Sequence, residues 1–235
     1  MMQAMLSIEG VGKSFTIHQL GKRIRACEDI DISIAPGQFV AITGRSGSGK
    51  STILKLVYRS YLPDRGSAWY LSERFGLIDL FKASERQILW LRKREIGYVS
   101  QFLSLVPRTT ARQALEQAAL EVGMTQEKAH EESERMLRHF ELGEELWDSY
   151  ASTFSGGEKL RLNVARAMVK HPRLLLLDEP TASLDEHSKG KVRELIERLK
   201  AEGTTMLGIF HDLQFMEGLC DREYSMSLGR FAGEP

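Results

Sequence analysis

The sequence predicts an α/β fold in which a central parallel sheet is interrupted by an inserted block of helices. Three short apolar stretches have the composition of buried strands, namely residues 38–44, 174–177 and 204–212. Segments with helical periodicity separate them, and strands that alternate with helices form parallel sheets. Between about residues 105 and 165 this alternation stops, and Ala, Glu, Gln and Arg predominate. We therefore expect a helical subdomain inserted into the sheet-forming core.

Composition limits the class of protein. The chain has 235 residues, of which 42% are hydrophobic, with 32 basic and 32 acidic side chains. A chain of this size buries about 70% of its unfolded surface and needs no disulfides to hold one compact domain. Because a nucleic-acid binder usually carries a basic excess, the zero net charge predicts no nucleic-acid partner.

Three features of the sequence bear on localisation. Cys27 and Cys220 are far apart, which favours two reduced thiols. The opening residues lack the charged-then-apolar pattern of a signal peptide. No apolar run approaches the ~20 residues that cross a bilayer. We expect a cytoplasmic protein without direct membrane insertion, which would act at a membrane only through a partner.

The first elements in chain order are strands. Residues 6–18 and 32–43 show alternating or β-branched patterns broken by Gly and Pro, which is typical of short strands. The stretch QFVAITG leads directly into a glycine-rich loop, and residues 50–62 after it have helical periodicity. Strand, glycine loop and helix, in this order, form the context in which a phosphate-binding loop occurs.

A helix and a strand are expected next. Residues 84–95 have helical periodicity, and Ser84 with Gln87 three residues later predicts a capping box at the start of that helix. IGYVSQ, residues 96–101, follows as a strand.

The remaining helices follow the same periodicity. Between about residues 109 and 150, apolar residues recur at helical spacing, for example Leu115, Ala118, Ala119 and Val122. Residues 188–203 predict an amphipathic helix that Gly203 terminates. Its apolar face holds Val192, Leu195, Ile196 and Leu199.

The glycine-rich loop predicts a nucleoside triphosphate site. Glycines let the backbone wrap closely enough for its amides to face phosphate oxygens, and the following helix adds its N-terminal dipole. Lys50 is expected to reach the β- and γ-phosphates, the Ser51 hydroxyl to ligate Mg²⁺, and Thr52 to add a phosphate contact. The loop consists of Gly44, Arg45, Ser46, Gly47, Ser48, Gly49, Lys50 and Ser51.

Carboxylates follow a second buried strand. Four leucines deliver Asp178 and Glu179 at the end of that strand. We expect Asp178 to hold Mg²⁺ through its water shell and Glu179 to polarise the attacking water. His211 ends a third strand of the same sheet and is expected to point at the γ-phosphate. Glu179, His211 and Lys50 are therefore the predicted catalytic residues.

A second glycine pair raises the question of a second anion site. Ser155, Gly156 and Gly157 stand just before a long amphipathic helix, whose N-terminus favours anions. One ATP does not need two glycine cradles from one chain. The economical interpretation is that this second cradle caps the γ-phosphate of ATP held by another copy of the fold.

Five motifs in order, GRSGSGKST, VSQ, FSGGE, LLLLDEPTASLD and FHD, resemble those of the ATP-binding cassette (ABC) ATPases over essentially the whole chain. The resemblance implies a P-loop NTPase fold with a RecA-like parallel sheet, an N-terminal antiparallel β subdomain and an inserted α-helical subdomain. It implies one ABC ATPase domain over residues 1–235. The nucleotide-binding core would cover about 1–104 and 166–235, and the helical signature subdomain 105–165.

The resemblance also assigns roles to single residues. Phe15 matches the aromatic that stacks on adenine, and Gln101 the glutamine that ligates Mg²⁺ and senses the γ-phosphate. Asp185, with Ser183 and Leu184, matches the loop that crosses the dimer interface, and His211 matches the switch histidine. ATP and Mg²⁺ are the implied cofactors of an ATP hydrolase.

Two positions depart from the commoner family pattern. Glu158 stands where many members have Gln, which puts a carboxylate near a polyphosphate and is compatible with slower hydrolysis or a nearby basic partner. Phe154 replaces the commoner Leu, which we expect to be neutral packing.

The family resemblance implies a head-to-tail dimer, either a homodimer or a pair with a related cassette, closed by two ATPs. SQFLSLVPR and STFSGGE further resemble PhnL-type ATP-binding subunits of the bacterial carbon–phosphorus lyase system, which degrades phosphonates. Core subunits of that soluble lyase are then the expected partners. One alternative is the nucleotide-binding subunit of a membrane transporter for lipoprotein or phosphonate. Another is a binding module that hardly hydrolyses ATP, against which Glu179 counts.

Overall fold

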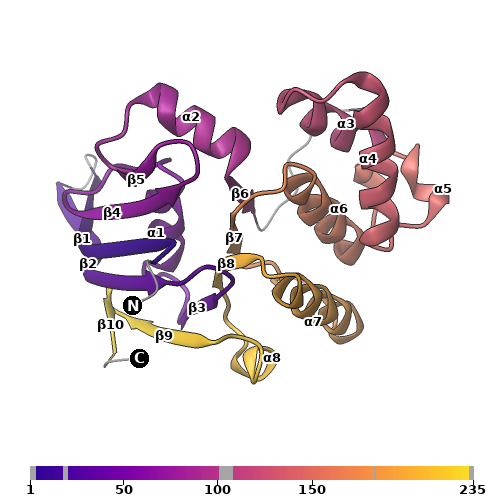
Figure 1. Ribbon diagram of the computed structural model, residues 1–235. Coiled ribbons are helices and arrows are strands. Elements are labelled where there is room, and N and C mark those ends of the chain that lie inside the picture. Colours follow the sequence, from indigo (N-terminus) through magenta and orange to yellow (C-terminus); the bar gives the residue numbers. More distant parts are fainter. Residues whose placement is uncertain (1–3, 18–20, 101–107, 183, 233–235) are drawn as a thin grey trace.

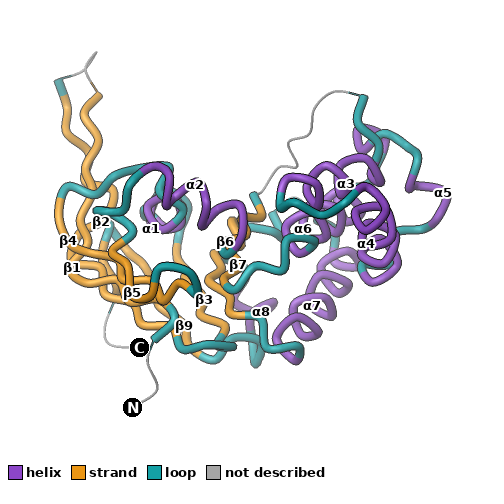
Figure 2. Tube along the Cα trace, turned by 45° about the horizontal axis from the view of Figure 1, so that its top comes forward, coloured by secondary structure: helices purple, strands orange, loops and turns teal. Residues whose placement is uncertain are grey.

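The computed structural model describes residues 4–17, 21–100, 108–182 and 184–232 (Figure 1). Two sheets and a group of helices make up this part of the chain. The sheets lie side by side, and most of the helices gather beyond the edge of the second sheet (Figures 1 and 2).

The first sheet is antiparallel and has the strand order β2-β1-β4-β5. Its long strands alternate between buried and exposed side chains, as expected of a sheet with one face on the core. Ile30, Ile32 and Ile34 of β2 are all buried. The strands are β1 (Leu6–Ile17), β2 (Lys22–Ile34), β4 (Arg65–Ser72) and β5 (Gly76–Asp79).

The second sheet is parallel except for its last strand and has the order β10-β9-β3-β8-β7-β6. Every residue of β7 and β8 is buried, which explains their nearly continuous apolar sequences. Parallel pairing brings the carboxyl ends of β3, β7 and β8 to one edge, where the predicted site residues follow. The strands are β3 (Phe39–Gly44), β6 (Ile96–Val99), β7 (Leu174–Asp178), β8 (Thr205–Ile209), β9 (Arg222–Ser227) and β10 (Arg230–Phe231).

Helices α3, α4, α5 and α6 lie together beside the sheets, as the predicted helical insertion requires (Figure 2). The division proposed at residue 165 falls inside a helix, because α6 continues to Met168. The helices are α1 (Lys50–Val57), α2 (Glu85–Arg94), α3 (Ala111–Glu121), α4 (Gln126–His139), α5 (Glu144–Trp147), α6 (Gly156–Met168), α7 (Glu186–Ala201) and α8 (Leu213–Met216), with a 3₁₀ turn at Ala151–Thr153.

Local signals account for several helix boundaries. The predicted capping box opens α2: the Ser84 hydroxyl accepts from the Gln87 amide, and the Gln87 side chain accepts from the Ser84 amide. Gly203, the predicted terminator of α7, has a left-handed φ of 81° just beyond the helix. The apolar faces predicted for α3 and α7 are buried.

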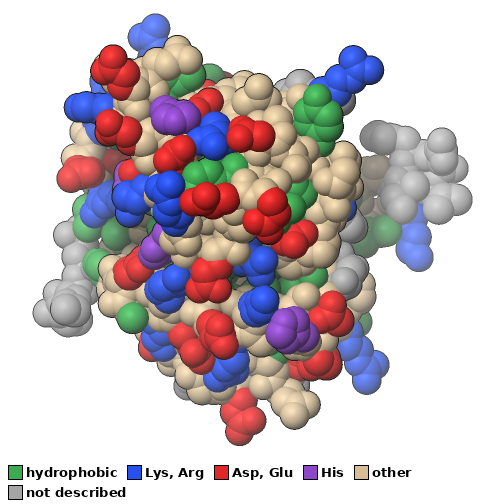
Figure 3. Space-filling model, turned by 90° about the vertical axis from the view of Figure 1, so that its right-hand side faces the viewer, with side chains coloured by type: hydrophobic (Ala, Val, Ile, Leu, Met, Phe, Trp, Pro, Cys, Tyr) green, Lys and Arg blue, Asp and Glu red, His purple; other side chains and the backbone are tan. Residues whose placement is uncertain are grey.

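The outer face of the helical group carries both signs of charge, closely interspersed (Figure 3). Arg112 pairs with Glu134 and Asp148, and Arg135 pairs with Glu132. These pairs satisfy one another within the chain, so this face has the character of a solvated surface.

The sequence predicts no membrane-spanning segment and two reduced cysteines. Within its four described stretches, none of the helices combines the length and apolar content of a bilayer-spanning segment. Cys27 and Cys220 are free thiols, and burial raises the pKa of Cys27 to about 11.

Candidate active site

The phosphate loop is wedged between neighbouring strands in a way that only glycine allows. Gly44 and Gly49 have φ values of 136° and 106°. A Cβ atom would lie 2.2 Å from the Met226 carbonyl oxygen at Gly44 and 1.9 Å from the Ala26 carbonyl oxygen at Gly49. The loop backbone therefore passes against β9 on one side and β2 on the other.

Lys50 is the first residue of α1 and is buried beneath the loop. Its ammonium donates to the Gly44 carbonyl at 2.8 Å and to the Arg45 carbonyl at 2.9 Å. Burial lowers the pKa of Lys50, while the nearby carboxylates of Glu179 and Asp178 act in the opposite direction. A buried cation thus lies between the loop and the two predicted carboxylates.

The loop fits a polyphosphate group. The Ser48 hydroxyl is buried and has no hydrogen-bond partner among the described residues, although a buried hydroxyl normally has one. Gly47 has a φ of 77°, and open space surrounds the position of its missing Cβ. Ser51 and Thr52 occupy the first turn of α1, where backbone amides favour an anion.

Asp178 ends β7 and receives a hydrogen bond from the Tyr98 hydroxyl of β6, at 2.5 Å to Oδ2. Burial, and then this hydrogen bond, raises the pKa of Tyr98 well above its usual value, so the hydroxyl remains a donor. Over the part of the chain that is described, three or more His, Cys, Asp or Glu residues never converge on a metal position. A hydroxyl at Ser51 and one carboxylate at Asp178 suit Mg²⁺, which keeps waters and phosphate oxygens as its other ligands.

Glu179 and His211 are in direct contact. His211 Nε2 lies 2.6 Å from Glu179 Oε1, and His211 Nδ1 donates to the Gly44 carbonyl at 3.1 Å. Glu179 has a left-handed φ of 53°, uncommon for a residue with a side chain. The histidine therefore bridges the predicted base and the phosphate loop.

The second glycine pair opens α6 with a complete capping box. The Ser155 hydroxyl accepts from the Glu158 amide at 3.3 Å, and the Glu158 carboxylate accepts from the Ser155 amide at 2.7 Å. This hydrogen bond lowers the pKa of Glu158. The Glu158 carboxylate, expected beside a polyphosphate, is thus bound to its own helix terminus. Ser155 and Gly156 are exposed.

Asp185 lies beside the second glycine pair. We call Ser155, Gly156, Gly157 and Asp185 the second group. The first group is the phosphate loop together with Asp178, Glu179 and His211. It is the N-cap of α7 and accepts from the Ser188 amide at 2.8 Å, a bond that lowers the pKa of its carboxyl. A Cβ on Gly157 would lie 3.2 Å from the Ser188 hydroxyl, so the start of α6 adjoins the start of α7. Between described residues, no hydrogen bond or ion pair joins this group to the phosphate loop, Asp178, Glu179 or His211. The two groups stand on different elements of one chain, the first at the start of α1 and the end of β7, the second at the starts of α6 and α7.

The structure does not test the roles predicted for Phe15, Gln101 and Ser183. Phe15 on β1 is paired with Ile24 of β2, two residues before Ala26, which touches the phosphate loop. Its ring makes an edge-to-face contact with Tyr61 at 5.1 Å. Adenine stacking on Phe15 stays a prediction. Gln101 lies outside the described residues, as does Ser183.

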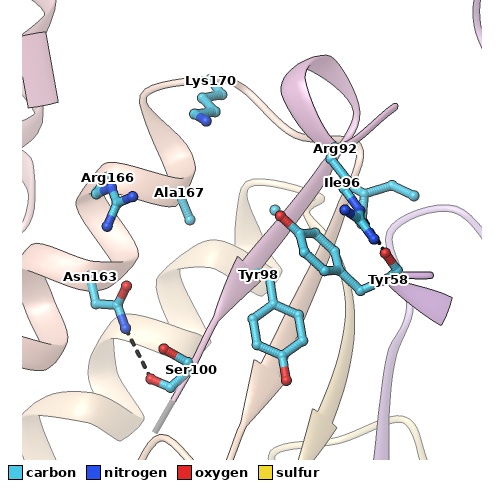
Figure 4. A pocket seen from close by; sticks show the side chains of 10 residues that line it. Tyr58, Arg92, Ile96, Tyr98, Ser100, Asn163, Arg166, Ala167 and Lys170 are labelled. Atoms are coloured by element: carbon cyan, nitrogen blue, oxygen red, sulfur yellow. Dashed lines mark hydrogen bonds between the residues drawn. The ribbon is translucent and has the colours of Figure 1, made fainter. Parts of the chain in front are cut away.

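Sequence reasoning missed Tyr98 and Asn163. Asn163 of α6 donates to the Ser100 carbonyl at 2.9 Å and so ties the helical group to the end of β6 (Figure 4). The available signal was a tyrosine within the apolar strand IGYV, because a buried tyrosine needs a partner for its hydroxyl. Phe154, expected to pack neutrally, is buried in the core.

Comparison with protein families gives a match to the model described as ABC transporter, over residues 27–182. Among curated relatives, the L-cystine import ATP-binding protein TcyN of Bacillus subtilis is 32% identical over 96% of this chain and 83% of its own. The lipoprotein-releasing system ATP-binding protein LolD of Shewanella oneidensis is 31% identical over 97% of this chain and 96% of its own.

Solved structures show the same fold. The dimeric post-hydrolysis state of the ATP-binding cassette MJ0796, bound to ADP and Pi, superimposes with a TM-score of 0.87 at 26% identity. It covers 98% of each chain. The predicted α/β architecture is thereby confirmed.

Proposed function

Since the chain belongs to the ABC transporter family, and is thus an ATPase that uses ATP and Mg²⁺, we propose that two copies or related cassettes close around ATP to drive a partner protein. The observation that carries this proposal is that the two groups expected to bind anions stand on different elements and share no hydrogen bond or ion pair between described residues. Ser155 and Gly156 are exposed, and neither they nor Asp185 contacts the phosphate loop through a hydrogen bond between described residues. A head-to-tail pair would bring the second group of one copy to the first group of the other.

The described residues suit ATP hydrolysis at such an interface. Lys50 and the loop amides would bind the phosphates. Glu179 would accept a proton from the attacking water, and His211 would orient the Glu179 carboxylate. Ser51 and Asp178 would hold Mg²⁺, which neutralises phosphate charge when it is bound. Loss of the γ-phosphate would remove the contacts that hold the copies together.

The Glu179→Gln variant tests this assignment. We expect its ATP turnover to fall at least about 100-fold, because an amide cannot accept the proton. We also expect ATP to hold it as a dimer, which light scattering after size-exclusion chromatography measures. Lys50→Ala, which loses the buried ammonium, should bind no nucleotide and stay monomeric. Turnover at the parental rate in Glu179→Gln would refute the base assignment.

The names of the relatives support a membrane transporter as the partner. TcyN is named for L-cystine import and LolD for lipoprotein release. In this proposal the ATP-driven closing of the two cassettes moves a transporter subunit. The nature of the transported molecule follows from that subunit and not from the site described above.

A second candidate partner is the carbon–phosphorus lyase core. It is favoured by the stretches SQFLSLVPR and STFSGGE, which resemble PhnL-type subunits more specifically than the widespread DEPTASLD. In that case the same dimer would act on a phosphonate-degrading complex.

Affinity purification from phosphate-starved cells distinguishes the two candidates. The tagged chain is recovered separately from the membrane fraction, with detergent, and from the fraction without membranes. Co-purification of a permease supports the transporter and excludes the lyase as main partner. Recovery of lyase core subunits without detergent supports the second candidate and overturns the first.

A further inference from the structure

A cavity of about 290 Å³ lies between β6, the end of α1 and the face of α6 (Figure 4). Among the described residues, its walls include three basic side chains, Arg92, Arg166 and Lys170, and no carboxylate. Two tyrosine rings, those of Tyr58 and Tyr98, form another part of its lining. Tyr98 also contacts the site described above, through its hydroxyl.

A series of contacts leads from the cavity wall to Asp178, the expected Mg²⁺ ligand. The Arg92 guanidinium lies 4.6 Å from the Tyr58 ring and donates to the Tyr58 carbonyl at 2.7 Å. The Tyr58 and Tyr98 rings are 4.8 Å apart, centroid to centroid, at 41°. The Tyr98 hydroxyl points away from the basic side chains (Figure 4) and donates to Asp178 Oδ2 at 2.5 Å.

We propose that Tyr98 is a positioning residue that orients the Asp178 carboxylate for Mg²⁺, and that the Tyr58 ring and the Arg92 guanidinium hold the Tyr98 ring in place from the cavity side. This inference rests on the proposed function, in which Asp178 serves the metal bound with ATP.

The physical basis is the geometry of one carboxylate. The hydrogen bond to Oδ2 restricts the rotation of the Asp178 carboxyl group, which would hold the water shell of Mg²⁺ when the ion is bound. Partners that orient a metal ligand in this way commonly change metal affinity by about 10- to 100-fold when they are removed. Because the Tyr98 ring is packed against Tyr58, the hydroxyl position also depends on the cavity wall.

Tyr98→Phe isolates the hydroxyl, because it keeps the ring and its packing. Tyr58→Phe is the matched control, since it removes a hydroxyl from the same cavity that is not bonded to Asp178. Both are made in the Glu179→Gln background so that ATP affinity is measured at equilibrium by calorimetry. Each protein is titrated with ATP in EDTA and in excess Mg²⁺, and its melting temperature is recorded.

For Tyr98→Phe we expect the factor by which Mg²⁺ strengthens ATP binding to fall about tenfold. Its ATP affinity in EDTA should stay within twofold of the background, and Tyr58→Phe should match the background under both conditions. A Mg²⁺ factor unchanged in Tyr98→Phe overturns the proposal, and so does an equal loss in Tyr58→Phe. If the background protein itself shows no Mg²⁺-strengthened ATP binding, the proposed function fails instead, and the two failures are thereby separated.

Discussion

Gly49 shows how the neighbouring strand β2 shapes the phosphate loop. Its φ of 106° is left-handed, and an added Cβ would lie 1.9 Å from the Ala26 carbonyl oxygen. Backbone cannot move aside as a flexible side chain can. The close approach of loop to strand is therefore a condition for the loop conformation, and no other residue type satisfies it.

Gly49→Ala should destabilise the protein by about 2–5 kcal/mol, the sum of left-handed strain and overpacking. It should also abolish ATP binding, because relief of the clash displaces the loop. Urea unfolding and ATP titration measure the two effects.

Gly47→Ala is the control, since its φ is also left-handed, at 77°, but nothing lies within 4 Å of its Cβ position. It should lose only about 1–2 kcal/mol. Equal losses in the two variants would show that the contact with Ala26 is unimportant.

The site residues that could be predicted are those at fixed spacing along the chain. Lys50 follows its glycines directly, and Asp178 with Glu179 follows an apolar strand. The sequence signals a buried hydroxyl at Tyr98 but not its partner, because the bond to Asp178 joins residues 80 positions apart. The contact depends on the register of β6 against β7, in which Tyr98 pairs with Leu176.

Helix α6 begins with a charged capping box. The Glu158 carboxylate accepts from the Ser155 amide at 2.7 Å, and this bond lowers the pKa of Glu158. A depressed pKa in the folded state means that the ionised carboxylate stabilises the helix start. This stabilisation is complete above the unfolded pKa of about 4.3 and is lost as pH falls through the lower folded value.

Glu158→Gln keeps the shape of the box and removes its charge. We expect it to lower the free energy of unfolding at neutral pH by about 0.5 kcal/mol, the usual effect of an anion at a helix N-terminus. The difference from the parent should vanish as pH falls below the folded pKa. Urea unfolding over a pH series measures it, with the exposed Glu194→Gln as control. A difference that persists in acid would contradict the charge-based explanation.

Central elements of the fold could be predicted and peripheral ones could not. β3, β7 and β8 are buried on both faces, so their sequences are apolar and easily read as strands. β9 alternates between buried and exposed residues and carries two charges. It is a strand because Val40 of β3 pairs with Arg222, a long-range contact that local composition does not encode.

The two groups predicted to bind anions lie on different elements of the molecule. The first group follows the carboxyl ends of β3, β7 and β8, and the second opens α6 and α7. Asn163 of α6 donates a hydrogen bond to the Ser100 carbonyl, directly after β6, and so connects the helical group to the second sheet. A nucleotide that binds both groups across two copies shifts the equilibrium toward the closed pair by its difference in affinity for the two states.

Mixing two inactive variants tests this arrangement most directly. Lys50→Ala removes the first group and leaves the second intact, whereas Gly156→Arg places a bulky side chain at the exposed first residue of α6 and leaves the phosphate loop intact. Each variant alone should have no ATPase activity. An equimolar mixture should regain activity, because a pair with one chain of each kind contains one complete site, in which the phosphate loop of Gly156→Arg faces the intact second group of Lys50→Ala. If the mixture is as inactive as its separate components, under conditions in which the parental protein forms pairs, each ATP is not shared between two chains.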